Sequence, residues 1–497
     1  MKIFTARQVR QWDQLTLQRR SISSARLMEQ AAGAAFQRIC ELFDFNHVTV
    51  LAGTGNNGGD GLCIARMASR LGKSVRVYIA GDTSKASADF LINLGRLETE
   101  PVQISRVGED DVHMEPASDL FVDALWGTGI RDKAEGFFVQ LIESVNTWSC
   151  HKVAIDLPSG LLPDLMEQQT GAIVRAHCTL TFGALKPALA FPENKLFCGQ
   201  IEVLDIGLDQ VYEADEPSDL IWFDGHEAKA CLLPFDYYHD KRDRGQVQLI
   251  AGSEGKMGAA VLAARAALRA GCGLVAASVP GCGLEILQTA VPEAMCERAE
   301  GMDHITSIRL QPAARVVAVG PGIGTADDTA RMIASVLAHA QAPLVIDADA
   351  LNLISAHNWM DRVPRGSVLT PHRREFDRLF GPHADTFARL HTMRRAAKKY
   401  GVTILLKGPA TMVADAEGSL SFNVSGHAGL GTAGSGDVLT GIIAGLCARG
   451  HSPATAARLG AYVHGAAADR LLLSRKSPLL LSGELADQLP AVFGDLQ

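Results

Sequence analysis

Residues 48–72, VTVLAGTGNNGGDGLCIARMASRLG, join a short apolar run to a helical segment through a loop of glycine and asparagine. The run VTVLAG predicts a buried strand, and GLCIARMASRLG predicts a helix. Further strand-like runs follow, SVRVYIAG, DLFVDAL and KVAIDLPSG, separated by helical stretches near ADFLINLGRL and FVQLIESVNTW. This alternation predicts a doubly wound parallel sheet, in which ligands bind in loops at the carboxyl ends of the strands.

The alternation pauses at residues 212–219, YEADEPSD, which are acidic, contain a proline and lack periodicity. It resumes with VQLIAGS, GAAVLAARAALRAG, RVVAVGPGIG, LVIDADALN, SVLTPH and TILLKGPATMVAD, and its glycine loops stand at other positions than in the first half. A chain of 497 residues is also too long for one ordinary core. The sequence therefore predicts two tandem three-layer α/β/α domains, a Rossmann-like one over residues 1–212 and a second over residues 223–497, with a linker over residues 213–222.

Composition argues against several classes of protein. The net charge is −8 and the chain has no block of lysine and arginine, which argues against a nucleic-acid partner. The ten cysteines are scattered without a CxxC pair, so we expect reduced core residues rather than disulfides or a zinc site. The N-terminus lacks the apolar core of a signal peptide, and no run of eighteen apolar residues follows, so we expect a cytoplasmic protein with no membrane partner.

The loop GNNGGDG, residues 55–61, follows a predicted strand and opens a predicted helix. Gly58 and Gly59 permit a close backbone approach, and the first amides of the helix would point at a ligand such as an anion or a sugar diphosphate. The alternative is a tight turn in which Asp60 caps the helix. This segment alone leaves both interpretations open.

Aspartates end two further strands of the first half. Asp123 closes LFVDAL and Asp156 closes KVAID, so both should face the same crevice as the GNNGGDG loop. With the hydroxyl of Ser159 they form a set of hard oxygen atoms, suited to a cation or to proton transfer. A helix cap or a surface turn would explain one such aspartate, but not three coincident loops.

The loop GLGTAGSGD, residues 429–437, runs into the apolar stretch VLTGIIAGL and predicts a glycine-rich turn that opens a helix. Its backbone N–H groups would bind the peripheral oxygens of a phosphoryl group. Asp437 would then remove the proton of an attacking hydroxyl, because the helix N-terminus keeps its carboxyl group ionised near neutral pH. The alternative is that Asp437 only caps its helix.

Other predicted loops of the second half carry ligand-binding residue types. GPGIG, residues 320–324, follows the strand RVVAV, and its glycines let a ligand approach the main chain. His372 and Glu375 follow another strand, although a lone histidine is more often structural than catalytic. Lys407 and Thr411 in LLKGPAT stand where they would contact a nucleotide phosphate or ribose.

The first half resembles a known enzyme domain. The segments LMEQAAG, GTGNNGGDG, DALWGTGI, DLPSGL, TFGALKPAL and GQIEVLDIGL, in this order, are similar to the epimerase domain that acts on hydrated NAD(P)H, over residues 1–210. The resemblance implies a potassium ion bound by Asn57, Asp123 and Ser159, and a contact of Asp156 with the substrate, for which we expect a catalytic role. The other substrate contacts that it implies are Asn56, Asn57, Gly58, Gly59, Asp60, Gly127, Thr128, Gly129, Ile130, Arg131, Asp132 and Lys133.

The second half resembles the nucleotide-dependent NAD(P)HX dehydratase, which has a ribokinase-like fold, over residues 225–497. The segments that carry this resemblance are LIAGSEGKMGAAVLAARAALRAG, VGPGIG, DADALN, LTPH, LLKGPAT, GTAGSGDVLTGIIAGL and AYVHGAAAD. It implies Asp437 as the catalytic base and Mg²⁺ bound with the nucleotide, Glu375 being a candidate for the outer coordination sphere. The implied contacts to the hydrated cofactor are Ala259, Gly322 and His372, and those to the adenine nucleotide are Lys407, Gly408, Pro409, Ala410, Thr411, Ser435 and Gly436. Arg373 and Arg374 stand where the family commonly has proline and glycine.

Together the resemblances imply a repair enzyme for NADHX and NADPHX, the hydrates of NADH and NADPH. The first domain would interconvert the R and S hydrates, and the second would dehydrate the S form with ADP, giving AMP and phosphate, or with ATP. We also expect a homo-oligomer. Two alternatives remain, a small-molecule kinase of the ribokinase superfamily and a first half that is a non-catalytic binding module.

Overall fold

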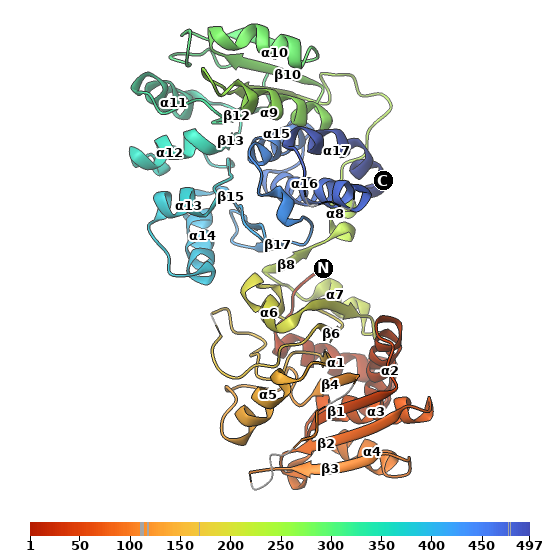
Figure 1. Ribbon diagram of the computed structural model, residues 1–497. Coiled ribbons are helices and arrows are strands. Elements are labelled where there is room, and N and C mark those ends of the chain that lie inside the picture. The colour runs from red at the N-terminus through yellow and green to blue at the C-terminus, as the bar shows by residue number, and fades with distance from the viewer. Residues whose placement is uncertain (110–113, 117–118, 168, 476, 478) are drawn as a thin grey trace. The chain divides into compact units, whose positions relative to one another are not determined.

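The computed structural model describes residues 1–109, 114–116, 119–167, 169–475, 477 and 479–497 (Figure 1). The chain divides into two compact units, Lys2–Ser218 and Asp219–Gln497, and Met1 belongs to the second. The division falls within residues 213–222, whose ends lie in regular structure, in helix α7 (Gln210–Asp215) and strand β8 (Leu220–Phe223). The prediction of two tandem α/β domains built on parallel strands is confirmed.

The N-terminal unit is built on a parallel sheet with the strand order β3-β2-β1-β4-β5-β6-β7. Its strands are β1 (His47–Gly53), β2 (Ser74–Ala80), β3 (Gln103–Val107), β4 (Leu120–Ala124), β5 (His151–Ile155), β6 (Cys178–Phe182) and β7 (Gln200–Leu204). The direction of the strand order reverses between β1 and β4. The loops that follow these two strands therefore diverge and leave a crevice, which is where ligands bind in sheets of this kind.

Helices cover both faces of this sheet. They are α1 (Ala6–Arg20), α2 (Ser24–Leu42), α3 (Asn56–Arg70), α4 (Ala88–Leu97), α5 (Phe137–Thr147) and the short α6 (Lys195–Cys198). Val50 and Val122 belong to the core shared with α1–α4, whereas Leu51 and Phe121 belong to the core shared with α5. Both faces of the central strands are thus buried, which explains why these strands are continuous apolar runs.

Side-chain caps fix where several of these helices begin. Thr5 and Gln8 form a reciprocal capping box at the start of α1. Ser23 caps α2 and Ser87 caps α4, each through a hydrogen bond from a first-turn amide to the serine hydroxyl. Such caps satisfy amides that have no partner within the helix.

The C-terminal unit is built on a mixed sheet with the order β11-β10-β9-β12-β13-β14-β15-β16-β17-β8. The strands are β8, β9 (Gln246–Ile250), β10 (Leu274–Val279), β11 (Met295–Arg298), β12 (Val316–Val319), β13 (Leu344–Ile346), β14 (Val368–Leu369), β15 (Thr403–Leu406), β16 (Met412–Ala414) and β17 (Leu420–Asn423). Strands β9–β15 are parallel, but β15, β16 and β17 pair in antiparallel fashion. TILLKGPATMVAD is therefore a hairpin of two strands, and residues 407–411 form its turn.

The helices of this unit are α8 (Gly225–Cys231), α9 (Met257–Arg269), α10 (Leu284–Ala290), α11 (Asp327–His339), α12 (Ala348–Ala356), α13 (Arg373–Phe380), α14 (Thr386–Tyr400), α15 (Ser435–Ala448), α16 (Pro453–Arg475) and α17 (Ser482–Leu496). Helices α9, α15, α16 and α17 share one apolar core with the sheet. A Cβ atom at Gly441 of α15 would lie 2.2 Å from the carbonyl oxygen of Ala263, so α9 and α15 pack backbone against backbone.

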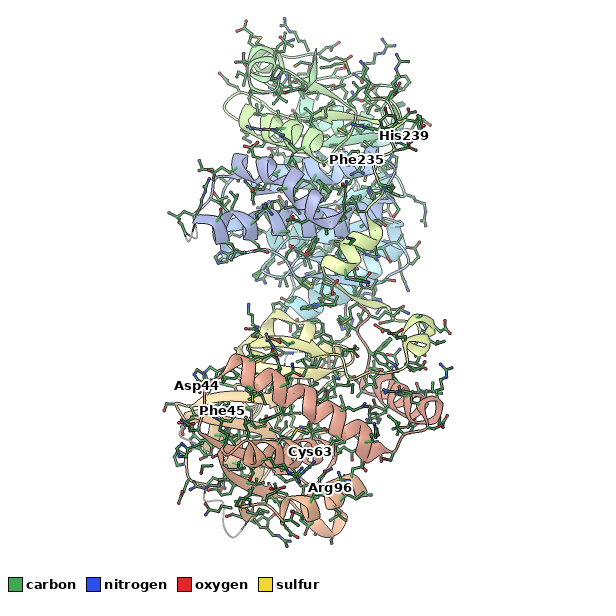
Figure 2. All side chains as sticks on the ribbon, turned by 90° about the vertical axis from the view of Figure 1, so that its right-hand side faces the viewer. Asp44, Phe45, Cys63, Arg96, Phe235 and His239 are labelled. Atoms are coloured by element: carbon green, nitrogen blue, oxygen red, sulfur yellow. The ribbon has the colours of Figure 1, made fainter. Side chains whose placement is uncertain are left out.

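The ten cysteines are free, and six of them, Cys63 on α3 among them, are buried (Figure 2). Cys40 is exposed, so the expectation that all ten lie in the core is wrong for that residue. Among the described residues, no helix is both long enough and apolar enough to cross a membrane.

Candidate active sites

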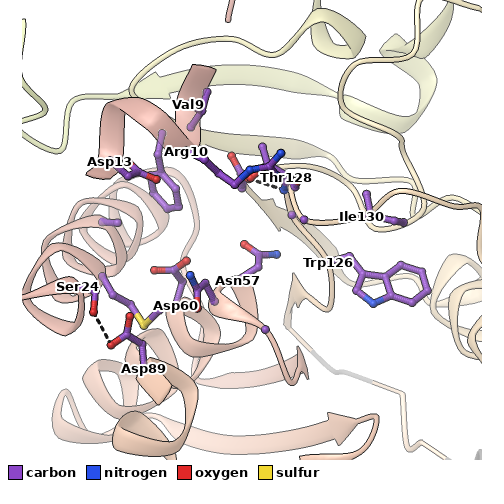
Figure 3. A pocket seen from close by; sticks show the side chains of 18 of the residues that line it. Val9, Arg10, Asp13, Ser24, Asn57, Asp60, Asp89, Trp126, Thr128 and Ile130 are labelled. Carbon is purple, nitrogen blue, oxygen red and sulfur yellow. Dashed lines mark hydrogen bonds between the residues drawn. The ribbon is translucent and has the colours of Figure 1, made fainter. Parts of the chain in front are cut away.

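The N-terminal unit contains a cavity of about 770 Å³ at the carboxyl ends of β1 and β4 (Figure 3). The loop after β1, the loop after β4 and helices α1–α4 contribute to its lining. Of the residues predicted to contact substrate, Asn56, Asn57, Asp60, Gly127, Thr128, Gly129 and Ile130 line this cavity. Its position at the reversal of the strand order makes it the candidate ligand site of this unit.

Helix α3 begins at Asn56, directly after Gly55, which caps it without a side-chain hydrogen bond. Asp60 lies inside the helix, so the alternative that it caps α3 is wrong. A Cβ atom at Gly58 would lie 1.7 Å from the carbonyl oxygen of Gly53, and one at Gly59 would lie 2.6 Å from the sulfur of Met28. These two buried glycines let α3 pack closely against β1 and α2, and they do not line the cavity.

Asp123 and Ser159 are in direct contact. The Asp123 carboxylate accepts hydrogen bonds from the Ser159 backbone N–H at 2.7 Å and hydroxyl at 2.6 Å. Burial raises the pKa of Asp123 to about 6, although the hydrogen bonds from Ser159 lower it. The amide of Asn57 is buried, and its oxygen and nitrogen both lack a hydrogen-bond partner among the described residues.

Asp156 follows β5 with a backbone φ of 66°, a strained conformation for a residue with a side chain. One carboxylate oxygen accepts hydrogen bonds from Lys186 Nζ at 2.6 Å and Thr181 Oγ1 at 3.3 Å. The other accepts from the backbone N–H of Thr128 at 3.0 Å. A Cβ atom at Gly127 would lie 2.8 Å from that second oxygen and 3.1 Å from the Asn57 amide carbon, so these three residues are close neighbours.

Some predicted residues lie elsewhere, and some site residues were missed. Arg131, Asp132 and Lys133 are exposed, outside the residues that line the cavity, and Lys133 donates a hydrogen bond to Thr170 at 2.8 Å. Lys186, which lies in the motif TFGALKPAL, is fully buried, and it was missed because a lysine after a strand carries no role by itself. Its position at a strand end was the available signal.

In the C-terminal unit, α15 begins at Ser435 after Gly434, which has a φ of 87° and provides no side-chain cap. Asp437 therefore lies within the first turn, and the alternative that it caps the helix is wrong. Burial raises the pKa of Asp437 to about 6, with a further contribution from the negative charge of Asp347, while Lys407 lowers it. A carboxylate with such a pKa is ionised at neutral pH and still basic enough to accept a proton.

Lys407 is anchored by Asp347. Its ammonium group donates a hydrogen bond to one Asp347 oxygen at 2.7 Å, and Thr440 Oγ1 donates to the other at 2.7 Å. Burial disfavours the charged lysine, but Asp347 and Glu375 raise the pKa of Lys407. A Cβ atom at Gly436 would lie 3.4 Å from Lys407 Nζ, so the predicted nucleotide residues Lys407 and Gly436 lie together. No local pattern around Asp347 in DADALN or Thr440 in VLTGIIAGL predicts the contacts that Asp347 makes with Lys407 and Thr440.

His372 caps α13 as part of a capping box. Its Nδ1 accepts a hydrogen bond from the Glu375 N–H at 3.1 Å, and its own N–H donates to Glu375 at 2.8 Å. The Lys407 N–H donates to the carbonyl of Pro371 at 2.9 Å, which places His372 beside the β15–β16 turn. Gly408 and Pro409 in this turn are exposed, and Ala410 and Thr411 are half-buried.

Ala259 and Gly322 are neighbours, because a Cβ atom at Gly322 would lie 3.2 Å from the Ala259 Cβ. The loop that contains Gly322 also contacts Asp349, whose charge acts on Asp437. The Asp349 carboxylate accepts hydrogen bonds from the Gly324 N–H at 2.9 Å and Lys256 Nζ at 3.3 Å, and its charge raises the pKa of Asp437. Among the described residues, no group of three or more histidine, cysteine, aspartate or glutamate side chains is arranged to hold a metal ion.

The fold and these sites define an α/β protein in which a Rossmann-like domain with a pocket precedes a domain with a glycine-rich loop at the start of a helix. The family NAD(P)H-hydrate dehydratase matches residues 247–491, and the family YjeF-related protein N-terminus matches residues 24–188. Bifunctional NAD(P)H-hydrate repair enzymes match almost end to end. That of Moorella thermoacetica is 34% identical over 100% of this chain and 97% of its own, and that of Escherichia coli is 35% identical over 90% and 85%. The chain belongs to the family of bifunctional NAD(P)H-hydrate repair enzymes, as the motifs predicted.

A solved structure matches the C-terminal unit. The ADP/ATP-dependent NAD(P)H-hydrate dehydratase of Bacillus subtilis, co-crystallised with ATP and Mg²⁺, is 29% identical with a TM-score of 0.50, covering 56% of this chain and 99% of its own. A ribokinase-like superfamily protein of Enterococcus faecalis is 28% identical with the same TM-score of 0.50. The predicted ribokinase-like fold is confirmed.

Proposed function

We propose that this protein repairs hydrated NADH and NADPH. The N-terminal unit interconverts the R and S hydrates, and the C-terminal unit dehydrates the S hydrate at the expense of ADP. The observation that carries the proposal is the position of Asp437 in the first turn of α15, beside the anchored ammonium group of Lys407. This arrangement places a proton acceptor beside two sources of positive charge for a phosphoryl group, the N-terminus of α15 and the Lys407 ammonium group. The substrate is inferred from the family to which the chain belongs.

In the proposed dehydration, Asp437 accepts the proton of the hydroxyl group on the reduced nicotinamide ring. That oxygen forms a bond to the terminal phosphorus of the nucleotide, whose bond to its bridging oxygen breaks. The amides at the start of α15 and the Lys407 ammonium group stabilise the negative charge on the phosphoryl oxygens. The ring nitrogen then releases its electron pair into the ring, the carbon–oxygen bond breaks with loss of phosphate, and loss of a proton from the adjacent carbon restores NAD(P)H.

Magnesium fits this site through the nucleotide rather than through a protein cage. Mg²⁺ in such sites is bound mainly by substrate phosphates and water, and it neutralises phosphate charge when bound. Glu375 suits an outer contact only, because both its carboxylate oxygens already face His372, one at 2.8 Å from its backbone nitrogen and the other at 3.4 Å from Nε2. The Bacillus subtilis relative, which was crystallised with ATP and Mg²⁺, supports this expectation.

A monovalent cation suits the N-terminal unit. The Asp123 carboxylate is fully buried and has no cationic partner among the described residues, and the buried Asn57 amide oxygen lacks a partner there as well. Together with the Ser159 hydroxyl these are hard oxygen ligands, so we propose that they hold K⁺. Bound there, K⁺ would compensate the Asp123 charge and orient the Asn57 side chain at the edge of the cavity.

The test is to incubate the protein with a mixture of R and S hydrated NADH, Mg²⁺ and either ADP or ATP. We expect both epimers to be consumed, NADH to reappear, and phosphate to be released with AMP from ADP or with ADP from ATP, which identifies the nucleotide. Asp437→Asn should abolish the recovery of NADH. A stable phosphorylated product without NADH would instead indicate a small-molecule kinase.

A further inference from the structure

Five aspartates line the cavity of the N-terminal unit, and four of them, all except the exposed Asp82, lie in its buried or half-buried part with a single buried lysine. Asp13 comes from α1, Asp60 from α3 and Asp89 from α4, and these three line the cavity from three different helices (Figure 3). Asp156 and Lys186 line it from the strand ends of the sheet. The residues come from segments far apart in the sequence, so only the fold assembles them.

Among the aspartates of the cavity, only Asp156 accepts a hydrogen bond from Lys186. Its ammonium group donates to Asp156 at 2.6 Å, to Thr181 Oγ1 at 2.8 Å and to the carbonyl oxygen of Phe182 at 3.2 Å. These three acceptors use all three ammonium protons. Lys186 therefore pairs with Asp156 and has no proton left to donate to another aspartate.

Asp13 and Asp60 have no such compensation. No hydrogen bond from a described residue reaches either carboxyl group, whereas Asp89 accepts one from the Ser24 hydroxyl at 2.9 Å. Asp60 is only 9% exposed. An unpaired, buried carboxyl group that lines a cavity costs stability unless it holds a proton or meets a ligand.

The environment of Asp13 and Asp60 favours the protonated form of both carboxyl groups. Burial raises the pKa of Asp13 to about 6, against a smaller lowering by Lys186. Burial and the charges of Asp156 and Asp13 raise the pKa of Asp60 well above its usual range. One cavity thus holds both a carboxyl group paired with a lysine and carboxyl groups whose pKa values burial raises, the division of environments that acid–base enzymes use.

Epimerisation of the hydrate needs both a group that donates a proton and a group that accepts one. The carbon that carries the hydroxyl group is also bonded to the ring nitrogen, so its configuration is lost when the carbon–oxygen bond breaks and the nitrogen electron pair moves into the bond to carbon. The departing hydroxyl group must take a proton to leave as water. The water that adds to the opposite face must then give up a proton.

We propose that Asp13 is a second catalytic residue of the epimerase site, which protonates the departing hydroxyl group while Asp156 accepts the proton of the incoming water. This inference rests on the proposed function of the N-terminal cavity. In the step, the Asp13 O–H bond and the ring carbon–oxygen bond break, and one water molecule leaves. A second water forms the new carbon–oxygen bond and transfers one proton to Asp156.

The return of the proton completes the cycle. After one turnover Asp156 has gained the proton that Asp13 has lost, and no other species has been consumed. We assign the return of the proton to Asp60, because it lines the same cavity as both aspartates. The reverse reaction uses the same groups in opposite protonation states, as an epimerase requires.

The experiment measures conversion of purified S hydrate into R hydrate by the full chain without nucleotide, so that dehydration does not occur. Asp13→Asn keeps the size of the side chain but removes its transferable proton, so we expect kcat to fall by about 100-fold or more with little change in KM. Asp13→Glu should restore part of this loss. The control is Asp44→Asn, an exposed carboxyl group outside the cavity lining, which should retain the parent rate (Figure 2).

The outcomes separate this inference from the function on which it rests. Asp13→Asn with an unchanged kcat, or with a higher KM alone, overturns the catalytic role of Asp13 and indicates substrate binding. A parent protein that does not interconvert the epimers, or Asp156→Asn at the parent rate, overturns the proposed epimerase site and this inference with it. Thermal unfolding of each variant checks that the N-terminal unit has folded.

Discussion

The ionisation of Asp437 should control the rate of the reaction in the C-terminal unit. Burial raises its pKa to about 6, so the carboxylate that accepts the substrate proton is lost as the pH falls through that value. With purified S hydrate and ADP, we expect kcat/KM to fall about tenfold for each pH unit below the pKa and to be level above it. A stopped assay of NADH formation at several pH values measures this, and a level profile down to pH values near the usual aspartate pKa would contradict the role of Asp437 as base.

The buried carboxylate of Asp347 is the counter-ion of the Lys407 ammonium group. It accepts hydrogen bonds from Lys407 and Thr440, and it is only 1% exposed. Asp347→Asn leaves the Lys407 charge without its counter-ion, so we expect the free energy of unfolding of the C-terminal unit to fall by about 3 kcal/mol. Urea unfolding measures the loss. Asp361→Asn, at an exposed position of the same unit, is the control and should leave the unfolding midpoint unchanged.

The contact between helices α9 and α15 positions the first turn of α15, which carries Asp437, the proposed base. A Cβ atom at Gly441 would lie 2.2 Å from the carbonyl oxygen of Ala263, and one at Gly445 would lie 2.6 Å from that of Ala267. Gly441→Ala must push the helices apart, so we expect a loss of about 1–3 kcal/mol of stability. Since α15 carries Asp437 at its start, dehydratase activity should fall with it.

The matched control lies on another helix of the same unit. A Cβ atom at Gly494 of α17 meets no atom within 4 Å, so Gly494→Ala should be neutral or should stabilise by up to about 1 kcal/mol through helix propensity. Thermal unfolding of both variants separates the two effects. Equal melting temperatures for Gly441→Ala and the parent would show that α9 and α15 can separate at little cost.

The sequence predicted elements well where a local pattern decided them. Apolar runs such as VTVLAG and LFVDAL became buried strands, and the glycine loops became the starts of α3 and α15. The segment TILLKGPATMVAD forms two strands, β15 and β16, and the Gly408–Pro409 dipeptide in its turn was a local signal for this break that the strand assignment did not use. The roles of Asp13, Lys186 and Asp347 depend on contacts across the fold, which no local pattern encodes.

The two units of the chain have separate cores and separate candidate sites. The proposed reactions are nevertheless consecutive. An enzyme that dehydrates one epimer of the hydrate leaves the other behind, so a chain with an epimerase unit can drain the whole pool. The two units are then related only through the hydrate on which both act. Each unit should therefore work when the other is inactivated.

Inactivating one site at a time tests this relation. With an R and S mixture and excess ADP, Asp156→Asn should consume the S hydrate at the parent rate and then slow to the uncatalysed rate of epimerisation, whereas the parent should consume both epimers. Asp437→Asn should interconvert the epimers without forming NADH. Because the hydrate diffuses freely between molecules, mixing the two variants should restore complete consumption, which chromatography of the two epimers would follow.

If Asp156→Asn alone consumed both epimers as fast as the parent, Asp156 would have no part in epimerisation. If the mixed variants consumed only the S form, the hydrate would have to pass between units of one chain.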